Sequence, residues 1–282
     1  MLIFNKQSFL IEHLAPFWTS KTSIGFVPTM GALHAGHLSL LAKSLENNAI
    51  TVISIFVNPT QFNNPEDLAK YPRTLDRDIE KIESLSKDII VFAPTVEDIY
   101  AQQIVSKTFQ YDGLENQMEG KHRPGHFDGV GTIVKRLFEI IKPTHAYFGE
   151  KDFQQLQIVK KLVQKNNIPV QIVGCPIHRE ENGLALSSRN ERLSTAERKE
   201  AALIFKTLTE AKMWFGTKSA REVTTFVENV FKNHATMSLE YFEIADETSL
   251  ITCLRKSKNK QYRAFIAVFV NNIRLIDTIS LK

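Results

Sequence analysis

The sequence predicts an α/β fold, in which a Rossmann-like parallel sheet with flanking helices is followed by a smaller α+β C-terminal domain. In the first part of the chain, short apolar runs alternate with helical patterns, which is typical of a parallel sheet with crossover helices. Near residue 176 the order changes, and two helical patterns precede three strand-like runs. The 282 residues also exceed the usual size of a single hydrophobic core. We therefore expect two domains, at residues 1–176 and 177–282.

The first domain is expected to contain five strands and four helices. Apolar runs predict strands at 24–27, 50–57, 89–93, 145–148 and 170–175. Apolar residues at helical spacing predict helices near 36–47, 74–86, 129–142 and 152–166. Pro28 is expected to end the first strand, because proline has no backbone N–H to donate.

The second domain is expected to contain two helices and three strands. The helices are predicted at about 195–215 and 219–234, and the strands at 239–245, 262–270 and 273–280. Asn271 and Asn272 lie between two β-rich runs, which predicts a tight hairpin. The basic segment 255–260 is interpreted as a solvated turn.

Composition argues against a nucleic-acid-binding, disulfide-rich or membrane protein. The chain has 43% hydrophobic residues, and its 35 basic and 31 acidic residues leave a net charge of +4, which is too small to indicate a nucleic acid partner. Only Cys175 and Cys253 are cysteines, so we expect no disulfide framework and a cytoplasmic protein. No run approaches about 18 apolar residues, and the N-terminus lacks a secretory pattern, which predicts no membrane association.

Two histidines three residues apart follow the first predicted strand. Residues 28–40 read PTMGALHAGHLSL, with a helix expected from about Gly36. The amides and dipole of that helix N-terminus favour a phosphate, which Gly31 and Gly36 let approach and to which His34 and His37 can donate. An ordinary turn and a metal site are the alternatives. The metal site is the weaker of the two, because the His-Glu-x-x-His pattern and nearby cysteines are absent.

Further polar side chains follow the second and fourth strands, where ligands of open parallel sheets bind. Asn58 and Gln61 carry amides suited to hydroxyl and carboxylate groups, although Asn-Pro is also a common turn. Lys151 suits a phosphate. Asp152 suits either a helix N-cap or a ribose hydroxyl, and Gln155 lies one turn inside the next helix.

Two loops supply more donors. Ser187, Ser188 and Arg189 form a run without an acidic side chain, which favours a phosphate clamp. The alternative is a polar loop between domains, with a helix beginning near Ser194. Residues 120–127 form a basic loop that either covers the crevice or lies on the surface.

Six segments, taken in order, resemble motifs of the pantothenate synthetase (pantoate-beta-alanine ligase) family, within the nucleotidyltransferase superfamily that carries a His-x-Gly-His motif. They are PTMGALHAGH at 28–37, ISIFVNPTQF at 53–62, YPRT at 71–74, RPGHF at 123–127, AYFGEKDFQQL at 146–156 and GLALSSRN at 183–190. The resemblance covers most of the first 195 residues, and the second domain matches more loosely, so the detailed role of that domain is left open.

The resemblance implies an ATP-dependent condensation of (R)-pantoate with β-alanine to pantothenate, through a pantoyl adenylate, with release of AMP and pyrophosphate. It implies ATP as substrate with Mg²⁺ on its phosphate oxygens, small-molecule partners and a homodimer. Asp78 and Asp152 are candidates for reaching the metal, although no protein ligand is assigned to it. The first domain would bind ATP and pantoate, and the second would act as a lid that excludes water.

The same resemblance implies the site residues. ATP would be held by Met30, Gly31, Ala32, Leu33, His34, Ala35, Gly36, His37, Gly149, Glu150, Lys151, Asp152, His178, Leu186, Ser187, Ser188 and Arg189. The expected catalytic residues among them are His34, His37, Lys151 and Arg189. Pantoate would be held by Gln61 and Gln155, with Asn58 and Arg123 as further candidates, and Gln61 would also lie near β-alanine.

Two positions depart from the family pattern. His178 stands where a small aliphatic residue is usual, and Asn182 stands where aspartate is usual.

Three other functions share features of the chain: a nucleotidyltransferase that makes a dinucleotide, an aminoacyl-tRNA synthetase and a non-catalytic nucleotide sensor. The aminoacyl-tRNA synthetase function is disfavoured, because the sequence shows no evident anticodon-binding module and no strongly basic face.

Overall fold

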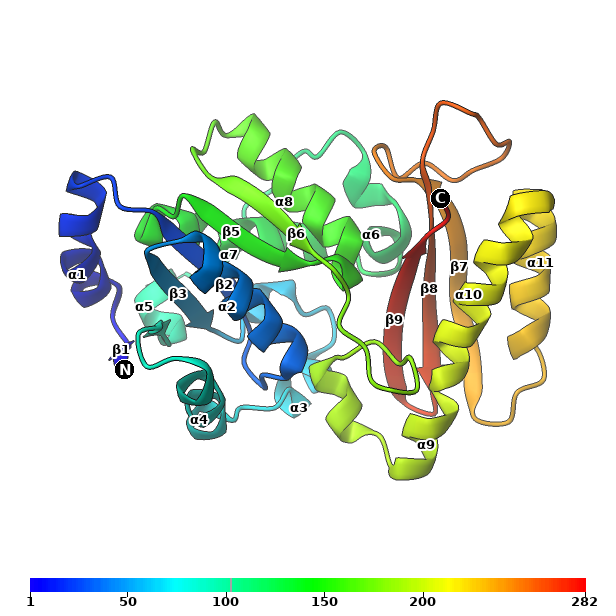
Figure 1. Ribbon diagram of the computed structural model, residues 1–282, viewed down its shortest axis with the longest axis horizontal. Helices are drawn as coiled ribbons and strands as arrows, with labels where there is room; N and C mark the ends of the chain where they lie inside the picture. The colour runs from blue at the N-terminus through cyan, green and yellow to red at the C-terminus, as the bar shows by residue number, and fades with distance from the viewer. Residues whose placement is uncertain (102) are drawn as a thin grey trace.

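The computed structural model describes residues 1–101 and 103–282. Its first sheet is parallel, with six strands in the order β1-β4-β3-β2-β5-β6 (Figure 1). The strands are β1 (Leu2–Phe4), β2 (Ile24–Thr29), β3 (Ile50–Ile55), β4 (Ile90–Phe92), β5 (His145–Gly149) and β6 (Gln171–Cys175). The five predicted strands are therefore confirmed. The sequence analysis missed β1, a three-residue edge strand that is too short to show a periodic pattern.

Pro28 does not end its strand, contrary to the expectation from sequence. β2 continues to Thr29, whose carbonyl accepts from the Phe56 amide in the segment after β3 at 3.0 Å. Backbone groups of successive strand residues point to opposite sides, so Pro28 faces β5. β2 pairs with β5 only at Gly25 and Phe26. The missing donor therefore interrupts no ladder, which is the situation in which a strand tolerates proline.

Helices cover both faces of this sheet. Buried residues alternate along the strands: Phe26 and Val52 pack with α1 (Gln7–Thr19), α7 (His126–Ile141) and α8 (Phe153–Lys165). Val27 and Ile53 pack on the opposite face with α2 (Ala35–Asn47) and α4 (Leu75–Leu85). The four predicted helices correspond to α2, α4, α7 and α8. The shorter helical elements are α3 (Pro65–Lys70), α5 (Val96–Tyr100), α6 (Met118–His122), η1 (Pro59–Gln61), η2 (Leu114–Asn116), η3 (Glu150–Asp152) and η4 (Ser188–Arg192).

A second, antiparallel sheet of three strands follows, in the order β7-β8-β9. Its strands are β7 (Met237–Asp246), β8 (Tyr262–Val270) and β9 (Ile273–Ser280), and its helices are α9 (Thr195–Glu200), α10 (Ala202–Thr217) and α11 (Ala220–Phe231). The helix expected at 195–215 is thus divided at Ala201. The hairpin at Asn271 and Asn272 and the helix start at Ser194, with its Glu197 capping box, are confirmed.

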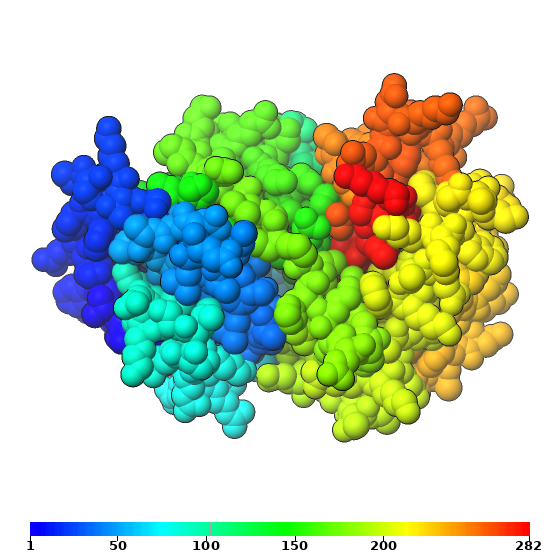
Figure 2. Space-filling view, in the orientation of Figure 1, coloured from blue at the N-terminus to red at the C-terminus, as the bar shows by residue number. Residues whose placement is uncertain are grey.

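The second sheet is buried on two sides. Ala264, Ile266 and Val268 pack with α10 and α11, whereas Phe265 faces the first sheet's helices and lies 6.0 Å from the Phe153 ring. Figure 2 shows the C-terminal segments, in yellow to red, packed against the green segments of the first part. The fold class predicted from sequence is confirmed, while the boundary at residue 176 stays a prediction.

Candidate active site

The candidate site is a cavity of about 240 Å³ beyond the carboxyl ends of β2, β3, β5 and β6. Chain order reverses between β2 and β5, and such switch points are where open parallel sheets bind ligands. The cavity gathers most of the predicted residues: Met30, His34, Gly36, His37, Asn58, Gln61, Arg123, Gly149, Lys151, Asp152, Gln155, His178, Leu186, Ser187, Ser188 and Arg189. Five predicted ATP contacts do not line it, namely Gly31, Ala32, Leu33, Ala35 and Glu150.

Asp78 binds the turn at residues 31–33 and holds it behind the residues that line the cavity. Its carboxylate is fully buried and accepts the amides of Ala32 at 2.9 Å and Leu33 at 2.7 Å. Gly31 has a φ of +82°, a conformation that suits glycine and lets the turn fold over this carboxylate. The amides of Ala32 and Leu33 are therefore taken by Asp78, while the assignment of these two residues to ATP stays a prediction. Asp78 is buried and holds the turn through these bonds, while its role as a metal candidate stays a prediction.

His34 and His37 lie side by side at the start of α2, with ring centroids 4.0 Å apart. The His34 amide lies 3.4 Å from His37 Nδ1, so a neutral His37 carries its proton on Nε2. His34 Nδ1 is buried and has no partner among the described residues. Burial lowers the pKa of His37 to about 4, with Lys151 and Lys81 adding to the effect. Burial and the His37 neighbour lower the pKa of His34 to about 2, so both rings are neutral N–H donors near pH 7.

Two lysines supply positive charge near these rings. Lys151 lines the cavity, and its ammonium lies 3.3 Å from Asp152. Lys81, which was not predicted, donates to the Leu33 carbonyl at 2.5 Å. Asp152 occupies the N-cap position of α8 but makes no capping hydrogen bond, so the capping interpretation is wrong. Its carboxylate instead lies in the cavity wall.

Glu150 turns away from the cavity toward the second sheet. Its carboxylate lies 3.4 Å from Arg263 in β8. Arg263 is 7% exposed and also pairs with Glu247 at 3.1 Å. Glu150 is therefore part of a contact between the two sheets.

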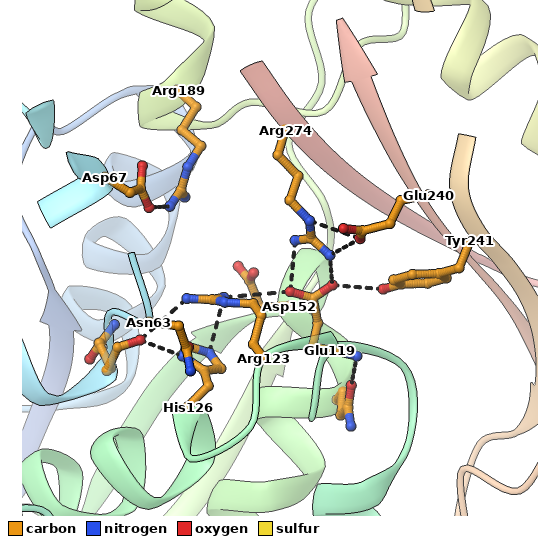
Figure 3. Close-up of polar contacts among 12 residues, drawn as sticks. Asn63, Asp67, Glu119, Arg123, His126, Asp152, Arg189, Glu240, Tyr241 and Arg274 are labelled. Carbon is orange, nitrogen blue, oxygen red and sulfur yellow. Dashed lines mark hydrogen bonds and ion pairs between the residues drawn. The ribbon is translucent and has the colours of Figure 1, made fainter. Parts of the chain in front are cut away.

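The loop at 186–190 closes one side of the cavity. The buried Ser188 hydroxyl donates to the Ala32 carbonyl at 3.0 Å, which ties the loop to the histidine turn. Ser187 Oγ accepts the Arg189 amide at 3.2 Å. The Arg189 guanidinium is not free: it lies 2.8 Å from Asp67 of α3 (Figure 3). Sequence reasoning missed this carboxylate, because it is distant in the chain.

Amide groups line the opposite side. Asn58 Nδ2 donates to Gln61 Oε1 at 3.1 Å, and Gln61 Nε2 lies 3.1 Å from the Met30 sulfur. Asn58 is 1% exposed and also accepts from the Tyr100 hydroxyl at 2.6 Å. The turn expected from Asn-Pro is present as η1, and Asn58 and Gln61 at its two ends line the cavity as well.

His126 is a cavity residue that the sequence analysis did not select, although it lies in the quoted RPGHF motif. Its Nδ1 lies 2.8 Å from the Gln61 carbonyl, to which Arg123 Nη2 also donates at 3.3 Å, and Figure 3 shows the His126 ring beside the Arg123 guanidinium. Its Nε2 lies 3.3 Å from Arg123 Nη1. Burial and the Arg123 charge lower the pKa of His126 to about 4, so Nδ1–H donates to the carbonyl and Nε2 accepts from arginine. The basic loop therefore contributes two side chains to the site.

The two departures from the family pattern have local explanations. His178 lines the cavity, and its carbonyl accepts the Leu186 amide at 3.0 Å, so its backbone joins two parts of the wall. Asn182 Oδ1 accepts the Leu184 amide at 3.0 Å, a bond that an aspartate oxygen would make equally well. The basic segment 255–260 is exposed, as expected.

In residues 1–101 and 103–282, no group of three or more His, Cys, Asp or Glu side chains could hold a metal ion. Within the same ranges, no helix combines the length and the apolar character needed to cross a membrane. Cys175 and Cys253 are both buried free thiols.

The chain matches the sequence profile of a family described as Pantoate-beta-alanine ligase over residues 3–280. It is 69% identical to a pantothenate synthetase of Flavobacterium psychrophilum and 56% identical to one of Christiangramia forsetii, in each case over 100% of both chains.

Solved structures of such enzymes are also similar. A pantothenate synthetase from Thermus thermophilus superposes with a TM-score of 0.91 at 36% identity, covering 100% of this chain and 99% of that one. A pantoate-beta-alanine ligase from Francisella tularensis, complexed with beta-gamma ATP and beta-alanine, superposes with a TM-score of 0.83 at 36% identity, covering 100% and 98%.

Proposed function

Because this chain belongs to the pantoate-beta-alanine ligase family, we propose that it condenses (R)-pantoate with β-alanine at the expense of ATP, through a pantoyl adenylate. The relative from Francisella tularensis was solved in a complex with beta-gamma ATP and beta-alanine, and both compounds are reactants in the proposed reaction. The observation that carries the detailed proposal is the convergence of His34, His37, Lys151 and Arg189 on one cavity.

The nucleotide is assigned to the side of the cavity built by the histidine turn and the 186–190 loop. A triphosphate needs several donors and positive charge, and this side offers two neutral imidazoles, Lys151, Ser187 and Arg189. Neutral imidazoles suit the task, because their N–H groups donate without the cost of keeping a buried cation in the empty site. The charge of the arriving phosphates would raise both histidine pKa values.

In the first step, a carboxylate oxygen of pantoate attacks the α-phosphorus of ATP. The bond from that phosphorus to the bridging oxygen breaks, and pyrophosphate leaves with its electron pair. Such a reaction depends on alignment and charge stabilisation more than on covalent catalysis. Gln61 and Gln155 are assigned to pantoate, with Asn58 and Arg123 as further candidates. Lys151 and the two histidines are assigned to the charge that develops on pyrophosphate.

In the second step, the β-alanine amine attacks the carbonyl carbon of the pantoyl adenylate. The amide bond forms, the bond to the AMP oxygen breaks, and the amine loses its proton. Water would hydrolyse the same mixed anhydride, so the site must be enclosed while the intermediate waits. The second domain, from residue 177, is assigned this role of a lid.

Mg²⁺ is expected to accompany ATP. It usually keeps several waters and takes one or two carboxylates in addition to phosphate oxygens. Asp152 fits that requirement, since it is the only carboxylate among the described residues that line the main cavity. The ion would neutralise phosphate charge, while the protein's own donors orient the nucleotide.

Three broader expectations belong to the same proposal. Two free thiols are consistent with a reducing, cytoplasmic setting. Leu2 and Ile3 are 49% and 47% exposed on the edge strand β1, which is consistent with a homodimer. The partners are expected to be small molecules and no nucleic acid.

A product assay tests the proposed function. The purified chain is incubated with ATP, Mg²⁺, (R)-pantoate and β-alanine, and the products are identified by mass spectrometry. We expect the amide, AMP and pyrophosphate in equal amounts. A nucleotidyltransferase would leave AMP inside its product, and a nucleotide sensor would bind ATP without releasing pyrophosphate, so either result would reject the proposal.

A further inference from the structure

Glu119 of α6 joins the second sheet to the candidate active site. Its carboxylate accepts from both terminal nitrogens of Arg274 in β9, at 2.9 and 2.6 Å, and from the Tyr241 hydroxyl in β7 at 2.8 Å (Figure 3). On its other side, Oε2 lies 3.5 Å from Arg123 Nη1. Glu119 is 8% exposed. Two guanidinium groups from different parts of the fold therefore share one buried carboxylate.

This carboxylate is charged at neutral pH. Burial alone would raise the pKa of Glu119, but the hydrogen bonds and charge of Arg274 lower it to about 2. Arg274 also pairs with Glu240 at 2.5 Å, so it has a second partner on its own sheet. Arg123 has no second carboxylate: among the described residues, Glu119 is its sole ion-pair partner.

The contacts continue from Arg123 to the substrate side of the cavity. Arg123 Nη2 donates to the Gln61 carbonyl, and Nη1 lies beside His126, which donates to the same carbonyl. Arg123 lines both the main cavity and a smaller adjoining one, whose wall also includes Glu119 and Tyr241. The position of the guanidinium thus depends on Glu119 on one side and on the η1 turn on the other.

Building on the proposed function, we propose that Glu119 is a positioning residue for Arg123. It holds the Arg123 guanidinium toward the cavity, where that group receives a substrate carboxylate, and Arg274 keeps Glu119 in place while the second sheet is docked. Both pantoate and β-alanine carry a carboxylate, and ATP carries none. Glu119 contacts no substrate in this account and acts through Arg123 alone.

The test compares Michaelis constants for the three substrates. Glu119→Gln keeps the shape of the side chain and removes its charge, so the Arg123 guanidinium loses its ionic partner while the Arg274 charge remains nearby. We expect the KM of one carboxylate substrate to rise about tenfold, which is typical of losing one charge-assisted bond, while the KM for ATP stays within about twofold. Varying pantoate and β-alanine separately identifies which carboxylate Arg123 receives.

Companion variants separate positioning from folding. Arg274→Met should give the same selective rise in KM, and Tyr241→Phe, which removes one hydrogen bond to Glu119, a smaller rise. In an Arg123→Ala background, Glu119→Gln should add no further change. The matched control is Asp112→Asn, which makes the same chemical change in an exposed carboxylate paired with Lys161 and Lys165, and should leave all constants unchanged.

The outcomes that overturn the inference are distinct from failure of the proposed function. Equal changes in all three KM values, no change in a folded Glu119→Gln variant, or full additivity with Arg123→Ala would each show that Glu119 does not position Arg123. Calorimetric binding of pantoate and of β-alanine gives the same comparison without turnover. An inactive wild-type chain would therefore reject the proposed reaction while the positioning role is still judged by binding.

Discussion

Arg189 Nη2 lies 2.8 Å from Asp67 Oδ2, so a cation of the candidate ATP site is already paired with a carboxylate from α3. Both side chains are partly exposed, and Arg192 approaches the same carboxylate at 3.5 Å. A guanidinium has five N–H donors, so Arg189 can keep this contact and still donate to a phosphate. The carboxylate charge, however, opposes the binding of a polyanion.

Asp67→Asn is therefore expected to strengthen ATP binding. The amide oxygen still accepts from Arg189, but the negative charge near the phosphates is gone. We expect the Kd for ATP to fall about two- to fivefold, the size typical of a partly exposed charge. Isothermal titration calorimetry measures it. Weaker binding would show instead that the full ion pair is needed to hold Arg189 in position.

His37→Ala is expected to lower turnover by on the order of 10² or more, the loss seen for one preorganised donor. The Nε2–H group of this residue is held at the start of α2 and is assigned to the phosphates. Steady-state kinetics and a circular dichroism spectrum check the result. His13→Ala in α1 is the control, because His13 packs on Phe4 and Phe17. Near-normal turnover in a folded His37 variant would remove His37 from the mechanism.

Gly36→Ala tests whether the ring of His34 is held by close packing. A Cβ at position 36 would lie 2.9 Å from His34 Cε1, so the ring must move. We expect kcat/KM for ATP to fall about tenfold with little loss of stability. Gly216→Ala is the matched control, since a Cβ there meets nothing within 4 Å and alanine favours a helix. Unchanged kinetics for Gly36→Ala would show that the His34 position is not critical.

Stability is expected to fall as the pH drops below about 6.5. The pKa values of His37 and His126 are each lowered to about 4 and that of His34 to about 2, against 6.5 in an unfolded chain. The unfolded chain therefore takes up protons first, so stability is fully present above 6.5 and declines toward pH 4. Urea unfolding at about pH 7.5 and about pH 5 measures this.

A His126→Asn variant provides the control for that measurement, because it removes one of the three rings whose pKa is lowered in the folded protein. Its free energy of unfolding should decline less over the same pH interval. Equal declines in the wild type and the variant would mean that His126 is not held neutral in the folded protein.

Much of the site followed from sequence, because the ends of parallel strands meet at one edge of the sheet. Four cavity residues each follow a strand or lie in a loop near one: His34, Asn58, Lys151 and Ser187. Local sequence patterns were therefore enough to predict that these residues lie close together. The same reasoning failed for Pro28, because whether a strand tolerates proline depends on its neighbour, which the local sequence does not specify.

The partners of the site residues were not predictable in this way. Asp78, which binds the amides of Ala32 and Leu33, is more than 40 positions away, at separations of 46 and 45. Glu119 and Arg274 are 155 positions apart. Contacts between residues so far apart leave no periodic signal in the chain, so they appear only in the folded structure.

In the proposed reaction, the carboxylate of pantoate is activated by transfer of AMP from ATP before any amine reacts. A single-turnover experiment with enzyme in excess, ATP and pantoate, but no β-alanine, measures this directly. We expect pyrophosphate in an amount equal to the limiting substrate, followed by AMP and the amide when β-alanine is added. Pyrophosphate that forms only once β-alanine is present would contradict the account.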